Sequence, residues 1–196
     1  MNDLFSDQKS IIDELFIRTA DDNYVLARWC FHQQLNVDFY WLAVHALEKY
    51  LKAVLLLNGR SAKPHGHDNV ALFADVAPLA PELLPAAFQR PDDDMPEPYW
   101  HVETVRDFIE RLYRDGRADN RYQLFGYSRR PEDLWKLDQA IFAIRRMCCP
   151  LEAYVLGKPY DGAANLSNRE VLAHYPGRWR LNSLLESTMG GSAATS

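Results

Sequence analysis

Residues Asn36–Gly59, NVDFYWLAVHALEKYLKAVLLLNG, decide the fold. The interior of this stretch is apolar except for a few polar positions, which fall on one stripe of a helix with 3.6 residues per turn: Asp38, His45, Glu48, Lys49 and Lys52. A helix of about 22 residues spans about 33 Å. The length and the pattern therefore predict the central rod of a small helical bundle, whose polar stripe is open to water or to a partner.

The same stretch argues against a membrane protein. A charge such as that of Lys49 or Lys52 near the centre of a bilayer costs about 3 kcal/mol on insertion scales.

Asn58 and Gly59 are residue types that tolerate a left-handed C-cap, so we expect the helix to end there. The first ten residues, MNDLFSDQKS, lack the basic and then apolar order of a signal peptide. We therefore expect a cytoplasmic protein without membrane contacts.

The amino-acid composition further limits the class of protein. A chain of 196 residues with 47% hydrophobic and 25% charged residues is typical of one globular domain. The net charge of -5 predicts no general attraction to nucleic acid, so any such binding needs a local basic patch. Cys30, Cys148 and Cys149 are too few for a disulfide framework and are expected to be reduced. The sequence holds no phosphate-binding glycine loop and no Gly-x-Ser-x-Gly elbow, and we expect no cofactor.

Helical periodicity predicts about five main helices, and no segment has the alternation of a strand. We therefore expect an all-α antiparallel bundle. Besides the central helix, the predicted helices cover residues 6–18, 19–32, 69–76, 99–115 and 131–150. Thr19 is predicted as the N-cap of the second, unless the first two form one bent helix. Asp68 is predicted as the N-cap of the helix at residues 69–76. In the helix at residues 99–115, the residues expected to face the core are Val102, Val105, Ile109 and Leu112.

The C-terminal part is predicted to be an appendage. Ser167-Asn168-Arg169-Glu170 has the pattern of a capping box that opens a short helix ending near His174, and a further helix is expected at residues 178–187. We predict a bundle over residues 1–157, an appendage over residues 158–189 and a flexible tail over residues 190–196.

Several pieces of the chain, taken together, resemble the sequence pattern of a known family. In the first helices they are Ala20-Asp21, Tyr24 and Ala27-Arg28. In the central helix they are His45-Ala46-Leu47-Glu48-Lys49, Leu51-Lys52 and Leu55-Leu56, and later in the chain they are His67-Asp68 and Arg121-Tyr122. This set spans about residues 18–150 and resembles the HEPN family of small prokaryotic helical domains.

The resemblance implies a homodimeric bundle, encoded beside a small nucleotidyltransferase that would be its partner. It further implies a module that binds a nucleotide or RNA in a toxin–antitoxin or defence system. The residues that would bind the nucleotide or the partner are His45, Glu48, Lys49, Lys52, His67, Arg121 and Tyr122. Lysines can meet phosphate oxygens, and arginines with aromatic side chains can stack bases. The alternative is a solvated helix face with a Glu48–Lys52 pair, and a surface loop around Arg121 that packs on the bundle.

A second function class is a metal-independent ribonuclease. In that branch of the family an Arg is followed by a His four to six residues later, but no His follows Arg145 or Arg146 in range. The spacing occurs at Arg169 and His174, our candidate catalytic pair, and at Arg60 with His65 or His67; chance predicts about one or two such hits. In this alternative the Arg stabilises charge on the phosphorus centre and the His moves a proton. His65, His67 and Asp68 are weak as metal ligands, and no metal is predicted.

Overall fold

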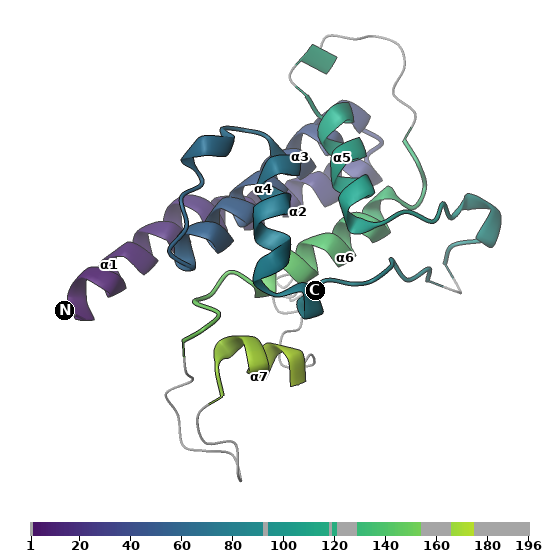
Figure 1. The fold of residues 1–196 in the computed structure, drawn as a ribbon. Helices are drawn as coiled ribbons and strands as arrows, with labels where there is room; N and C mark the ends of the chain where they lie inside the picture. The colour runs from purple at the N-terminus through teal and green to yellow at the C-terminus, as the bar shows by residue number, and fades with distance from the viewer. Residues whose placement is uncertain (1, 92–93, 118, 121–128, 154–165, 175–196) are drawn as a thin grey trace, which may run out of the picture.

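A computed structural model describes residues 2–91, 94–117, 119–120, 129–153 and 166–174. These residues form helices packed against one another, and no β-strand element occurs among them (Figure 1). The all-α prediction is therefore confirmed. No helix in this part of the chain is long and apolar enough to cross a membrane.

The chain begins with one long helical rod. The rod consists of α1 (Asn2–Ile12), a π-helical segment η1 (Asp13–Arg18) and α2 (Thr19–His32). The prediction that Thr19 caps a new helix is wrong, because its backbone is helical and its hydroxyl donates to the carbonyl of Leu15 at 2.8 Å. A hydroxyl bonded to the preceding turn has no need to end the helix. Of the alternative, one bent helix, the structure bears out a single helical run through this junction, with the π-helical segment η1 inside it.

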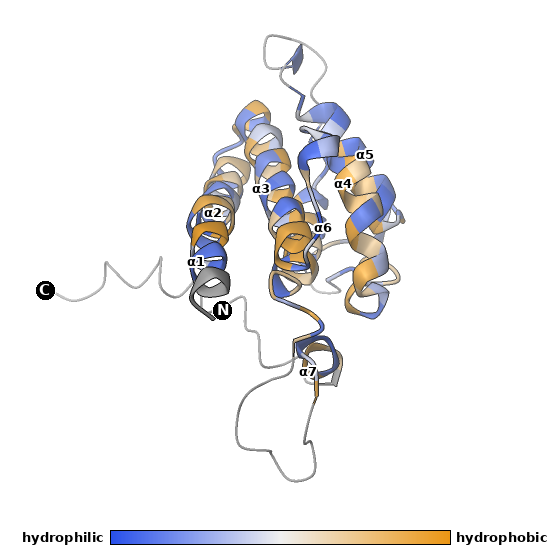
Figure 2. Cartoon of the chain, turned by 60° about the vertical axis from the view of Figure 1, so that its left-hand side comes forward, coloured by the Kyte–Doolittle hydropathy of each residue, from blue (hydrophilic) through white to orange (hydrophobic). Residues whose placement is uncertain are grey.

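The predicted central helix is α3 (Asn36–Leu57), and it contacts α2, α4, α5 and α6. A short link with Gln34 at φ 60 joins it to α2, which gives the expected hairpin. Gly59 follows the helix at φ +70, so the predicted left-handed end is confirmed. In Figure 2 the α1–α2 rod lies on one side of α3 and α6, and α4 and α5 lie on the other.

Helix α4 (Asn69–Val76) starts as predicted, since an Asp68 carboxylate oxygen accepts from the backbone N–H groups of Val70 and Ala71. Short 3-10 turns surround it: η2 (Lys63–His65), η3 (Ala77–Leu79), η4 (Pro81–Leu83) and, further on, η5 (Glu97–Tyr99).

Helix α5 (Val105–Asp115) begins later than predicted. Thr104 and Asp107 form a capping box that starts the helix, and Val102 precedes it with 88% of its surface exposed. The expected inward position of Val102 is therefore wrong, because the residues before Thr104 are not helical and do not follow the helical period. Gly116 ends the helix, and a β-carbon there would lie 2.6 Å from the carbonyl oxygen of Tyr40 on α3.

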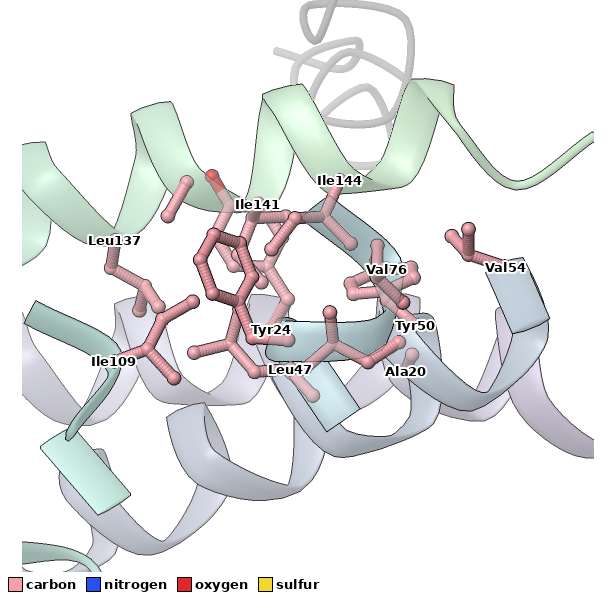
Figure 3. Packing of buried hydrophobic residues seen from close by; sticks show 14 of the residues in the cluster. Ala20, Tyr24, Leu47, Tyr50, Val54, Val76, Ile109, Leu137, Ile141 and Ile144 are labelled. Carbon is pink, nitrogen blue, oxygen red and sulfur yellow. The ribbon is translucent and has the colours of Figure 1, made fainter. Parts of the chain in front are cut away.

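Helix α6 (Asp133–Arg146) completes the bundle and ends four residues before Pro150. Apolar residues at helical spacing on one face of it are buried: Leu134, Leu137, Ile141 and Ile144. Figure 3 shows several of them packed with Tyr24 of α2 and Leu47 and Tyr50 of α3. Burying these apolar groups contributes about 25 cal/mol per Å² of area removed from water. All three cysteines are free, as expected.

A network of buried charges accompanies this apolar core. An Asp133 carboxylate oxygen accepts from Arg111 at 2.8 Å, and the other oxygen accepts from the hydroxyl of Tyr40 at 2.7 Å. The ammonium of Lys136, almost wholly buried, lies 2.7 Å from a carboxylate oxygen of Glu103. Buried charges are tolerated only when they are paired, so the network fixes the packing of α3, α5 and α6.

The capping box at Ser167 and Glu170 opens α7 (Asn168–His174) as predicted. Its first turn is joined to the chain after α6 by a hydrogen bond from the Asn168 N–H to the Ala153 carbonyl. The predicted helix at residues 178–187 and the predicted tail lie outside the described residues. The division into residues 1–157, 158–189 and 190–196 stays a prediction.

Candidate functional site

The polar stripe of α3 is organised around a buried carboxylate. Only 8% of the Glu48 side chain is exposed. Its Oε1 atom lies 2.7 Å from Nζ of Lys52 and 2.9 Å from Nδ1 of His67, and its Oε2 atom lies 3.5 Å from Nδ1 of His45. We call these four residues the Glu48 cluster. A carboxylate that is screened from water and surrounded by donors orients each of them.

The cluster keeps Glu48 ionised. Burial opposes ionisation, but hydrogen bonds from His45, Lys52 and His67 outweigh it and lower the pKa of Glu48 from 4.5 to about 2. Since an ionised carboxylate can only accept, Nδ1 of His67 carries the hydrogen of that bond. The Nε2 atom of His67 is then left for other partners, and 83% of this side chain is exposed.

The loop between α3 and α4 is anchored by its two histidines. Nε2 of His65 lies 2.8 Å from a carboxylate oxygen of Asp75 on α4, and His67 bonds to Glu48 on α3. Gly66, between them, has φ +54, a value that favours glycine. These contacts hold Lys63, which is exposed, at a fixed place beside α3.

A pocket of about 360 Å³ lies between this loop, α3 and the π-helical segment. Its apolar wall includes Phe16, Leu56 and Ala62, its cationic groups are Lys52 and Lys63, and the ring of His67 also lines it. No acidic residue is among the described residues that line it. We call it the basic pocket. It can hold an anion against the ammonium groups of Lys52 and Lys63, with an aromatic ring on the opposite segment.

The structure brings together four of the residues predicted to bind a ligand or partner, namely His45, Glu48, Lys52 and His67. It does not bring Lys49 to them, since the Lys49 ammonium points to the Thr19 carbonyl at 3.5 Å. Arg121 and Tyr122 lie outside the described residues. The expected Glu48–Lys52 pair forms, but Glu48 is buried rather than solvated.

Sequence reasoning missed Phe16 and Lys63. Lys63 stands in a basic loop, RSAKPHGH, next to the predicted His67, and this local charge could have indicated it. Phe16 gave no such signal, because its place beside Lys52 depends on how the first rod crosses α3.

The alternative catalytic pair is arranged differently. Nη2 of Arg169 lies 3.1 Å from Glu82, Nη1 lies 3.5 Å from Glu152, and its Nε also bonds to Glu82. The hydrogen bond with Glu82 raises the pKa of Arg169 above its ordinary value. His174 is the last residue of α7, and positions five apart in a helix are about 140° apart around its axis. Among the described residues no group of His, Cys, Asp and Glu is arranged to hold a metal ion.

Comparison with known proteins adds no relative: no family model, no curated protein and no solved structure matches this chain. The similarity to HEPN domains stays a prediction that rests on the residues given above.

Proposed function

We propose that this protein is a HEPN-like helical module that binds a nucleotide-class ligand in the basic pocket and performs no chemistry on it. The observation that carries the proposal is a pair of lysines, Lys52 and Lys63, that line one hollow with the ring of His67 and without a lining carboxylate. The whole chain has a net charge of -5, so this local excess of positive charge departs from the average surface.

Each group has a role in this proposal. Lys52 has one of its three hydrogens committed to Glu48 and can direct the others toward phosphate oxygens. Lys63 has no acidic partner among the described residues and supplies free charge. The ring of Phe16 offers a face for a base, and a pocket of this size is within the usual range of about 300–1,000 Å³ for small ligands.

Calorimetric titration with the four ribonucleoside 5′-monophosphates, beside the matching nucleosides, tests the proposal. We expect monophosphates to bind more tightly than nucleosides, and Lys63→Ala to weaken them about tenfold, the value of one charge-assisted hydrogen bond. Arg106→Ala, which removes an exposed cation on α5, is the matched control and should bind as the parent does. Absence of binding at millimolar nucleotide, or equal affinity of Lys63→Ala and the parent, contradicts the proposal.

We also propose a homodimer. The resemblance implies it, and exposed apolar side chains on the first rod give it physical support: Ile11, Leu15, Leu26 and Trp29. A twofold partner is the commonest way to bury such a surface. The implied nucleotidyltransferase partner, the toxin–antitoxin or defence role and the cytoplasmic location stay predictions.

The ribonuclease alternative has less support. The guanidinium of Arg169 is already paired with two carboxylates, whereas stabilising a phosphorus centre would require it to leave them. Incubating the protein with labelled RNA in excess EDTA tests this alternative. Cleavage that Arg169→Ala or His174→Ala abolishes would replace the binding proposal.

A further inference from the structure

A second pocket adjoins the basic pocket. It has a volume of about 310 Å³ and lies between α1, the end of α3 and the segment after α6. Its lining includes Lys9 and Ile12 of α1, Gly59, and Pro150. Leu56 lines both pockets, so the two hollows meet at this residue. We call the second hollow the Lys9 pocket.

The two pockets share the same chemistry. Each has apolar walls and at least one lysine, and neither contains an acidic residue among its described lining. Lys9 is exposed and, like Lys63, pairs with no carboxylate in the described part of the chain. A ligand that fits both must repeat an anionic group and a unit that packs on apolar walls.

Single-stranded nucleic acid has this repeat. Its phosphates recur along the backbone, and each of its bases has a flat face that packs on aromatic or aliphatic side chains. A mononucleotide fills only one of two hollows of similar size. The charges also suit a strand, since Lys63 lines one pocket and Lys9 lines the other, so that each lysine can serve a different phosphate group.

We infer that the basic pocket and the Lys9 pocket form one track for single-stranded nucleic acid, with neighbouring nucleotides on either side of Leu56. This inference rests on the proposed function, since it extends the ligand of the basic pocket. It adds that the preferred ligand is longer than one nucleotide and that Lys9 is a second contact to its backbone.

Fluorescence anisotropy with end-labelled eight-nucleotide RNA and DNA strands of mixed sequence tests the track. We expect at least one of them to bind about tenfold or more tightly than any mononucleotide. Lys9→Ala should weaken this binding several-fold and lower the slope of log affinity against log salt by about 0.7, the value for one phosphate contact of a single strand. Mononucleotide affinity should be unchanged in Lys9→Ala, because Lys9 does not line the basic pocket.

Two comparisons separate failure of the track from failure of the basic pocket. Strands that bind no more tightly than mononucleotides, or a Lys9→Ala variant with the strand affinity of the Arg106→Ala control, overturn the track and leave the basic pocket in place. Absence of binding to both strands and mononucleotides overturns both. Because Lys9 is exposed, circular dichroism melts should show that Lys9→Ala and Lys9→Glu fold as the parent does, and Lys9→Glu should weaken strand binding further.

Discussion

The Nδ1 atom of His67 lies 2.9 Å from Oε1 of Glu48. Glu48 belongs to α3, which ends ten residues before His67 in the chain. The same oxygen lies 2.7 Å from Nζ of Lys52. One buried carboxylate thus attaches the loop to α3 and orients two side chains that line the basic pocket, Lys52 and His67. The contact joins stability to the proposed function, because what fixes the loop also shapes the pocket.

Replacing Glu48 with Gln should destabilise the protein by about 1–3 kcal/mol, because the donors of Lys52 and His67 lose a charged acceptor in a buried place. Urea denaturation measures this as a lower midpoint. Glu14→Gln is the matched control, since it removes an exposed carboxylate that is paired with Arg18 one turn away, and it should change stability by less than about 0.5 kcal/mol. Equal midpoints for the two variants would contradict the role given to Glu48.

The pKa of Glu48 predicts how stability depends on pH. Its folded value, about 2, lies below the ordinary value of 4.5, so the unfolded chain binds a proton more readily there. The contribution is complete above pH 4.5 and is lost as pH falls toward 2; by linkage it amounts to about 3 kcal/mol. Urea midpoints from pH 5.5 to pH 3 should therefore fall less steeply in Glu48→Gln than in the parent. Parallel curves would show that Glu48 does not titrate as inferred.

The buried network around Asp133 is expected to be more sensitive than the Glu48 cluster. Asp133→Ala leaves the guanidinium of Arg111 short of one buried partner and removes the acceptor of the Tyr40 hydroxyl. Breaking a buried pair in this way costs about 3–5 kcal/mol. Asp22→Ala, at an exposed position of α2, should stay within about 0.5 kcal/mol of the parent. Similar melting temperatures for the two variants would argue against the network.

Gly116 and Gly59 are required for different physical reasons, namely space between helices and a positive φ. Replacing each with alanine should destabilise the protein by different amounts. A β-carbon at Gly116 would lie 2.5 Å from Cγ2 of Val44, so α5 and α3 must move apart; such overpacking costs about 1–3 kcal/mol. A β-carbon at Gly59 meets nothing within 4 Å, but its φ of +70 gives a backbone cost of about 1 kcal/mol. Thermal melts should show a larger fall in melting temperature for Gly116→Ala than for Gly59→Ala. The reverse order would mean that the helices adjust easily.

The sequence predicts local geometry better than contact between distant segments. The burial of Leu137 and Ile141 follows from helical spacing alone, and so does the common stripe of Glu48 and Lys52. The error at Val102 arose because spacing cannot show where a helix begins when a competing cap, here Thr104, lies inside the periodic segment.

The site was predictable in the same uneven way. His67 was expected there only through the family resemblance, because the path of the loop is not encoded in any period. Phe16 and Lys9 reach the two pockets through the position of the first rod against α3, which depends on packing. That packing requires the helix to continue through η1 into α2. The sequence around Thr19 is equally compatible with a new helix start, so it does not predict this continuation.

The exposed apolar residues of the first rod predict how the protein associates. Leu15 is 60% exposed and Trp29 is 55% exposed, and burying them in a twofold contact would remove apolar area from water. Light scattering coupled to size-exclusion chromatography should give twice the chain mass of 22.6 kDa for the parent. Leu15→Glu and Trp29→Glu should shift the protein to monomer, because a buried unpaired charge is costly. Val102→Glu is the matched control, because Val102 is also an exposed apolar residue but does not belong to the first rod, and this variant should remain dimeric. A monomeric parent would contradict the proposal that the rod is an interface between copies.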